Sequence, residues 1–203
     1  MKFGFLTVYW RDMLRFFRFR ALLVTSLIQP AIWLGLFGIA MTSIFARFST
    51  AIPLPPGVFL VSYLTFIAAG MIAMTTLFTS LFGGITLLFD KNWGMMREVL
   101  ASPIPRNDII IGMGLSGVTK SFIQVLILAG FAMLLGAQFF VNYTPLEIAV
   151  AVFGILLFVA LFSLGFVFLS SAIAVTMESP ESLQAVITLL SLPIFFTSNA
   201  LYP

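Results

Sequence analysis

The sequence predicts an all-α polytopic membrane protein with five spanning helices. Hydrophobic residues make up 61% of the 203 residues and charged residues 8%, whereas a soluble globular domain has about 45–50% and about 25%. Charged residues divide the chain into neutral stretches, each longer than the roughly 20 residues that a helix needs to cross the hydrocarbon core. None of these stretches alternates with a period of two, so we do not expect a β-barrel.

The neutral stretches place the spans in order within a single transmembrane domain, residues 1–203. A surface helix precedes the first span, and a cytoplasmic loop joins the second and third spans. These two spans exceed the bilayer thickness at about 1.5 Å per residue, so we expect both to project into the cytoplasm. The predicted elements are the surface helix over 2–19, spans over about 21–45, 57–88, 110–140, 148–176 and 183–201, and the loop over 90–108.

Residues 2–19 combine arginines with large apolar side chains. At 100° per residue, Arg11, Arg15 and Arg18 fall on one side of a helix, and aromatic residues cover most of the remaining surface. This pattern is typical of an interfacial helix in the cytoplasmic headgroup layer. The alternative is a basic flank whose only role is to orient the first span.

The distribution of basic residues predicts the orientation of the chain. If the N-terminus is cytoplasmic, the cytoplasmic segments hold eight basic residues and the opposite side holds only Arg47. Such a bias is the positive-inside pattern of membrane proteins. We therefore expect a multi-pass protein of the cell (plasma) membrane with a cytoplasmic N-terminus. The basic charge orients the chain in the lipid bilayer, and we expect no nucleic-acid partner.

The composition excludes several kinds of chemistry. Cysteine and histidine are absent, which removes thiolate chemistry and the commonest general base and metal ligand. Residues 112–117 match the G-x-G-x-x-G pattern, but the acidic residue that a dinucleotide site needs about 20 positions later is missing. Residues 114–121 lack the second glycine of a phosphate-binding loop. We therefore predict no catalytic residue, no metal site and no ATP-binding loop in this chain.

A few polar side chains fall inside the predicted spans. Their simplest role is hydrogen bonding between helices, worth about 1 kcal/mol or less each. The alternative is a lining for a transport pathway. The candidates for such a lining are Gln29, Thr75, Thr76, Thr79 and Lys120.

Lys120 interrupts the apolar third span. We favour a lysine at the cytoplasmic boundary, whose side chain extends to the headgroups, over an anion-binding role. None of the neutral stretches contains an acid that could pair with it. In the first and fifth spans, Pro30 and Pro193 are expected to kink or break their helices.

The loop between the second and third spans carries the most informative pattern. Gly94 can begin a short helix, which Pro103 and Pro105 would end. A short helix with an adaptable, methionine-rich apolar strip suits docking onto a soluble partner, and an ordinary interfacial loop is the alternative. The strip consists of Met95, Met96, Val99 and Leu100, next to Trp93.

This loop resembles the signature of permease subunits of type-2 ATP-binding-cassette (ABC) exporters. That signature runs from an acid and a base, through two variable positions and a glycine, to a short helix that ends in Ser/Thr-Pro and, shortly after, an arginine. The N-terminal helix, the long second and third spans and residues 198–203 also agree with the family. The matching residues are Asp90, Lys91, Gly94, Leu100, Ser102, Pro103, Pro105 and Arg106.

The resemblance implies a division of labour between subunits. A cytoplasmic ABC ATPase subunit would hold ATP and Mg²⁺, this chain would hold no cofactor, and a second permease chain would complete a dimer of identical subunits. The exported substrate would be an amphipathic drug-like molecule, a lipid or a lipid-linked compound. The implied contacts with the ATPase are Asp90, Lys91, Trp93, Gly94, Met95, Met96, Arg97, Glu98, Leu100, Pro103 and Arg106, with Arg11, Arg15 and Arg18 as a second contact.

The resemblance also implies a sixth span beyond Pro203, which this sequence does not contain. We therefore expect the last helix to end on the outer side of the membrane. Two other functions compete with an ABC permease, namely an ATP-independent carrier and a membrane scaffold without a transport role. A carrier would predict acids within the membrane or inverted repeats, and the sequence shows neither.

Overall fold

A computed structural model describes residues 4–38, 40–41, 62–102, 104–141 and 143–198. The regular elements in these residues are all helical, which confirms the predicted all-α class. They are α1 (Gly4–Arg18), α2 (Arg20–Trp33), the π-helical turn η1 (Leu34–Gly38), α4 (Tyr63–Asn92), α5 (Met95–Ala101), α6 (Arg106–Leu134), α7 (Pro145–Thr176) and α8 (Pro180–Thr197).

Four of these helices, α4, α6, α7 and α8, are long and apolar enough to cross a membrane. They correspond to the second to fifth predicted spans, and the chain is a multi-pass membrane protein. The first predicted span is described only in part. α2 and η1 form a helical run from Arg20 to Gly38, and residues 42–45 of that span lie outside the described residues.

The two prolines were predicted to kink or break their helices, and neither of them ends its helix. α2 continues past Pro30 to Trp33, and α8 continues past Pro193 to Thr197. A proline removes one backbone donor and crowds the carbonyl one turn earlier, so the hydrogen-bond pattern nearby must adjust. In the first case, the π-helical turn η1 follows within one helical turn, and such turns are a common adjustment inside helices.

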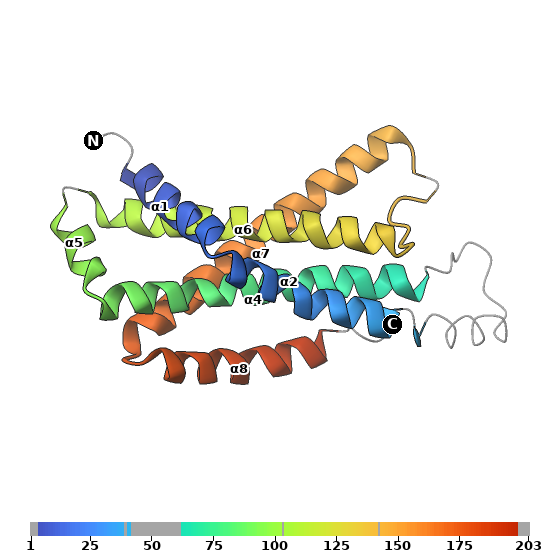
Figure 1. The fold of residues 1–203 in the computed structure, drawn as a ribbon. Coiled ribbons are helices and arrows are strands. Elements are labelled where there is room, and N and C mark those ends of the chain that lie inside the picture. Colours follow the sequence, from blue (N-terminus) through green and yellow to red (C-terminus); the bar gives the residue numbers. More distant parts are fainter. Residues whose placement is uncertain (1–3, 39, 42–61, 103, 142, 199–203) are drawn as a thin grey trace.

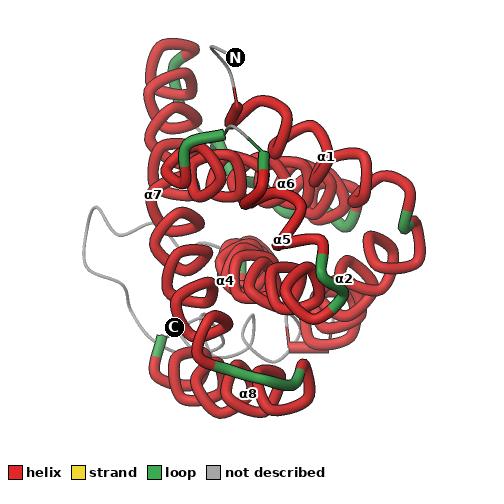
Figure 2. The backbone as a smooth tube through the Cα atoms, turned by 90° about the vertical axis from the view of Figure 1, so that its left-hand side faces the viewer, coloured by secondary structure: helices red, strands yellow, loops and turns green. Residues whose placement is uncertain are grey.

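α4 is the central helix of the bundle. Figure 2 shows α6, α2, α8 and α7 arranged around it, and Figure 1 shows α4 and α6 running side by side. α4 provides many of the completely buried apolar side chains, among them Ile67, Met71, Leu81 and Leu88, each 0% exposed. The spanning helices therefore share one packed centre, and the outer faces of α7 and α8 remain largely exposed.

Small residues let α4 and α7 approach closely. A Cβ atom built on Gly84 would overlap the Ser170 side chain and lie 2.6 Å from the Ser170 backbone oxygen. The Ser170 hydroxyl donates a hydrogen bond to the carbonyl of Leu81 on the facing helix. Close backbone approach of this kind is the usual way in which membrane helices gain packing energy.

The parts that the sequence analysis assigned to the cytoplasm lie at one end of the bundle. Figure 1 shows α5 and the beginning of α1 at the left, and the connection from α6 to α7 at the opposite end. A Cβ atom on Gly4 would lie 2.7 Å from the Ile104 side chain, so the start of α1 contacts the segment that links α5 to α6.

Candidate functional site

The short helix α5 forms where the sequence predicted it. α4 ends at Asn92, and Gly94 adopts φ 81°, a left-handed conformation that glycine enters without steric cost. The Gly94 carbonyl then accepts a hydrogen bond of 3.0 Å from the Arg97 backbone N–H, which starts the new helix. α5 ends at Ala101, because Ser102 is extended. Pro103 lies outside the described residues, and Pro105 precedes α6 as its N-cap.

α5 is the least buried helix in the described chain, since none of its residues is buried. Trp93 before it is 70% exposed and Leu100 is 51% exposed, although both are large and apolar. Arg97 and Glu98 are exposed on the same short helix. An apolar surface of this kind with charges beside it is suited to a protein contact.

The predicted apolar strip does not face outward as a whole. Met96 packs against the buried cluster that includes Leu87 and Leu88, and Met95 is half-buried with its sulfur 3.9 Å from the Arg15 guanidinium. The two methionines therefore hold α5 on the bundle. The strip mixes both kinds of position because a two-turn helix at the surface presents one side to the bundle and the other to its surroundings.

Asp90 is buried at the end of α4, where it is 4% exposed. Arg11 and Arg15 of α1 each donate a charge-assisted hydrogen bond of 2.6 Å, one to each oxygen of this carboxylate. Asp90 was predicted as a contact with the ATPase. The structure places its carboxylate inside the chain, where both oxygens already have partners from α1.

Lys91 follows Asp90 directly but makes its contacts elsewhere. Its Nζ donates hydrogen bonds to the carbonyl oxygens of Val175 (2.8 Å) and Met177 (2.9 Å), at the end of α7. The neighbouring Asn92 amide donates to the Glu178 carbonyl oxygen at 3.1 Å. The last carbonyls of a helix have no partner within it, so these side chains provide donors for them and attach the end of α4 to the α7–α8 connection.

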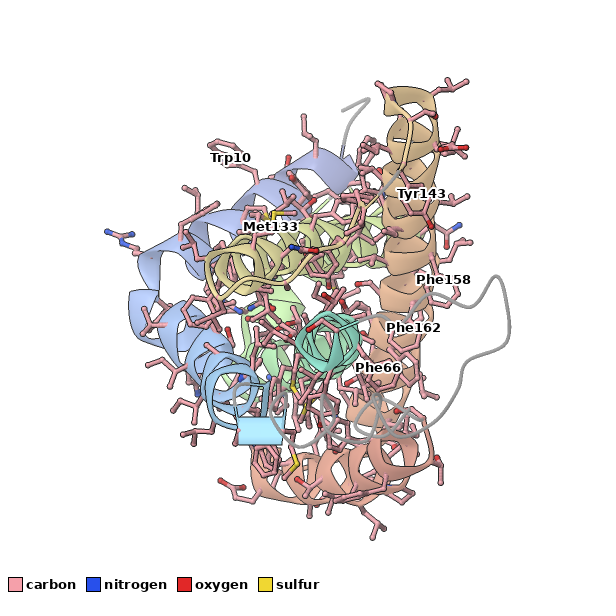
Figure 3. The ribbon with its side chains drawn as sticks, turned by 90° about the vertical axis from the view of Figure 1, so that its right-hand side faces the viewer. Trp10, Phe66, Met133, Tyr143, Phe158 and Phe162 are labelled. Carbon is pink, nitrogen blue, oxygen red and sulfur yellow. The ribbon has the colours of Figure 1, made fainter. Side chains whose placement is uncertain are left out.

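The N-terminal helix is present, but its arginines do not face the surroundings as a set. Arg11 and Arg15 point to Asp90, and only Arg18 is exposed. The outward face is apolar instead, and Figure 3 shows Trp10, which is 62% exposed, pointing away from the bundle. The exposed large side chains of this face are Leu6, Trp10, Leu14 and Phe17.

α1 packs along the first half of α6 in a regular register. Asp12 accepts hydrogen bonds from the Ser116 hydroxyl at 2.5 Å and from Lys120 Nζ at 2.7 Å. One turn away, a Cβ atom on Gly112 would lie 2.9 Å from Val8, so the two helices approach closely there. The neutral stretches hold no acid for Lys120, as the sequence analysis stated, and its partner Asp12 comes from the N-terminal helix instead.

Asp12 as a whole residue is 6% exposed. Burial raises its pKa, but the charge and hydrogen bond of Lys120, the hydroxyl of Ser116 and the charge of Arg11 outweigh that effect, so that the pKa of Asp12 lies below its usual value. The sequence analysis did not single out this residue. The sequence signal was an acid placed one helical turn before Phe16, on an apolar face of the N-terminal helix.

The predicted pathway candidates lie on three different helices, α2, α4 and α6. Thr75 and Thr76 are buried and bond to carbonyl oxygens of their own helix, those of Met71 and Ile72. Gln29 lies exposed on α2.

A buried glutamine links three helices near the middle of the bundle. The Thr79 hydroxyl of α4 donates to Gln124 of α6, and the Gln124 amide donates to the Ser26 hydroxyl of α2 at 2.7 Å. Thr79 therefore takes part in hydrogen bonding between helices, the simpler of the two predicted roles. Gln124 is 2% exposed, and a lone amide in an apolar span is the signal by which the sequence could have revealed it.

The described residues contain no group of three or more acidic side chains that could hold a metal ion. What they offer is a set of charged contacts around α5 and α1, all made within the chain. The arrangement can position a short exposed helix, and it provides no nucleophile paired with a base.

The model of the ABC-2 type transporter family matches residues 4–203. A protein of Pyropia yezoensis named "Putative transport permease ycf38" is 30% identical over 197 residues, which cover 95% of this chain and 62% of the relative. The protein of that name from Porphyra purpurea is 31% identical with the same coverage, 95% and 62%. The one from Cyanophora paradoxa is 29% identical over 182 residues, which cover 89% and 58%.

The chain thus spans about 62% of the length of the first two relatives. No solved structure matches it.

Proposed function

This chain belongs to the ABC-2 type transporter family, and from that membership we propose that it is the permease subunit of an ATP-driven exporter whose ATPase is a separate cytoplasmic protein. A membrane transport permease of this family is a transport component and not itself the ATPase. The proposal adds the partner, the place where it docks and the class of substrate.

The observation that carries the proposal is the exposure of α5. α5 is a two-turn helix that connects the end of α4 to the start of α6, and two large apolar side chains, Trp93 just before it and Leu100 on it, are exposed. Leaving these side chains exposed forgoes the burial of apolar surface, which is worth about 25 cal/mol per Å². A partner that covers them recovers that free energy, and Arg97 and Glu98 beside them offer polar contacts at the rim.

The docking surface that we propose is smaller than the one that the resemblance implies. Asp90, Lys91, Met95 and Met96 are engaged within the chain. We therefore assign the ATPase contact to Trp93, Arg97, Glu98 and Leu100, and we treat the other residues of the loop as the support that holds these four in place.

The remaining features of the proposal are those that the sequence and the family resemblance lead us to expect. The N-terminus and α5 lie in the cytoplasm of a cell with this protein in its plasma membrane, and two identical chains form the pathway. The substrate is an amphipathic drug-like molecule, a lipid or a lipid-linked compound. In support, Arg11 and Arg15 pair with Asp90 at the base of α5, and the outer faces of α7 and α8 are apolar.

Co-purification tests the docking surface. The tagged chain is isolated from its native membranes in mild detergent, and soluble proteins that accompany it are identified and assayed for ATP hydrolysis. We expect a stoichiometric ATPase with the native chain and its loss with Leu100→Asp. A chain that purifies without an ATPase would contradict the proposal.

Leu146→Asp is the matched control. Leu146 is 75% exposed, at the start of α7 and at the opposite end of the bundle from α5 (Figure 1). The same substitution there is expected to leave the ATPase bound. Equal loss in both variants would show that a new charge on any exposed leucine disturbs the protein, and would remove the support for α5.

Reconstitution tests the substrate class. The permease and its ATPase are placed in liposomes with a fluorescent lipid, an amphipathic dye or a hydrophilic sugar of similar mass. We expect ATP-dependent movement of the lipid or the dye. Movement of the sugar alone would overturn the substrate assignment and leave the permease assignment in place.

A further inference from the structure

Asp90 and Lys91 are consecutive residues at the end of α4, immediately before the turn into α5. Successive residues of a helix point about 100° apart, and these two side chains contact opposite sides of the bundle. The first is bound by α1 and the second binds the end of α7. The dipeptide therefore holds the base of α5 from two directions.

The contact with α1 is buried and charged. Asp90 receives both of its guanidinium partners at 2.6 Å, and the side chain of Arg15 also lies next to Met95, the first residue of α5. α1 is itself fixed to α6 by the pair of Asp12 and Lys120. A shift of the α5 base therefore cannot occur without moving α1 or breaking these ion pairs.

The contact with the α7–α8 connection consists of donors from α4 and carbonyl oxygens from the end of α7. Lys91 and Asn92 together bind three such oxygens, those of Val175, Met177 and Glu178. α8 begins at Pro180, two residues after the last of them. The connection that leads into α8 is thus attached to the end of α4, at the base of α5.

We propose that Asp90 and Lys91 are positioning residues that form a two-sided tether, through which a displacement of α5 is passed both to α1 and to the start of α8. Packed helices respond to such a displacement as rigid elements, because interiors this dense deform little. The tether would make the N-terminal helix and α8 move with the docking helix. The inference rests on the proposed function only for the source of that displacement.

Spin labelling tests the tether without a partner. The sequence contains no cysteine, so a single introduced cysteine carries a unique nitroxide in the full chain in lipid nanodiscs. The reporter positions are Thr7 on α1, Ala101 on α5 and Glu181 on α8, all exposed. Asp90→Asn and Lys91→Met each remove one side of the tether while keeping the size of the side chain.

The two variants should affect different reporters. We expect Asp90→Asn to raise nitroxide mobility at Thr7 and Ala101 and to leave Glu181 unchanged. We expect Lys91→Met to raise it at Glu181 and Ala101 and to leave Thr7 unchanged. Glu147→Gln, which removes an acid at the start of α7 but keeps a side chain able to complete the capping box with Thr144, is the matched control and should change none. Native mobility at Ala101 in both tether variants would overturn the proposal.

Transport adds a second readout. In the complex with the ATPase, both tether variants should still bind the ATPase but move several-fold less substrate for each ATP hydrolysed. If the native chain binds no ATPase, the proposed function fails and the spin-label result still decides the tether. If the ATPase binds and both variants keep the native ratio of transport to hydrolysis, the transmission role is overturned while the proposed function stands.

Discussion

Asp12 and Lys120 lie 108 positions apart in the chain and form an ion pair of 2.7 Å between α1 and α6. The side chains are 9% and 13% exposed, so both charges are largely removed from water. Ser116 completes the environment of the carboxylate with a further hydrogen bond. An N-terminal helix of modest length is thereby fixed to one face of a membrane-spanning helix.

Removing one partner of this pair should destabilise the protein strongly. Lys120→Met leaves Asp12 buried without its counter-charge, and breaking a buried pair in this way costs about 3–5 kcal/mol. The double variant Asp12→Leu with Lys120→Met removes both charges and should recover most of that loss. Thermal unfolding in detergent measures both variants, and a double variant no more stable than Lys120→Met would contradict this account.

The same pair predicts a response to acid. Because the folded chain holds the pKa of Asp12 below its ordinary value of 3.8, the carboxylate contributes stability that is present above that value. This stability is lost as the pH falls through the lower pKa of the folded state. Asp12→Asn should therefore flatten the dependence of stability on pH below about 3.8 and leave its course near neutral pH unchanged. An identical acid profile in this variant would exclude the contribution.

Two adjacent glycines give a sharp test of helix packing. A Cβ on Gly84 would collide with the backbone of Ser170, whereas a Cβ on Gly83 would meet only Val167 methyl groups at 3.7 Å, an ordinary contact. Gly84→Ala should destabilise the α4–α7 pair by about 1–3 kcal/mol. Gly83→Ala should be neutral or stabilising, because alanine favours helix by about 1 kcal/mol. Equal effects on unfolding would show that the two helices are not this close.

The turn into α5 depends on a glycine with positive φ. No atom lies within 4 Å of a Cβ built on Gly94, so the cost of a side chain there is conformational only. Gly94→Ala should destabilise this turn by about 1–2 kcal/mol. Gly94→Asn should cost less, because asparagine tolerates the left-handed region. Hydrogen exchange of the α5 amides reports the difference, and equal exchange in the two variants would refute the role of this backbone angle.

Much of the fold was predictable because the spanning helices consist of long apolar stretches with few charged residues. Charged residues mark the ends of the neutral stretches, and each of the four described spans overlaps one of these stretches. The short helix α5 was equally predictable, since Gly94 and the prolines after it mark its ends. The first span was predicted longer than the described helical run to Gly38, and part of it lies outside the described residues.

The direction of the arginines could not be predicted. A stripe of arginines on an aromatic helix fits a headgroup layer as well as it fits an acid from a distant helix, and a periodicity does not distinguish them. Asp90 is 75 positions away from Arg15, and only the packing of α1 beside α4 and α6 brings the two together. Asp12 and Gln124 could have been singled out in the sequence, but their partners come from distant parts of the chain and could not be predicted from it.

The long sequence separation of these pairs bears on how the protein is made. Arg11, Asp12 and Arg15 are synthesised 75 to 108 residues before the side chains that will neutralise them. At about 5–20 residues per second, the N-terminal helix waits about 5–20 seconds for Lys120. During that interval its charges need water or lipid headgroups, and an amphipathic helix at the membrane surface supplies such a resting place. The arginine stripe therefore suits α1 at the membrane surface during synthesis, and the same arginines form ion pairs once the bundle has folded.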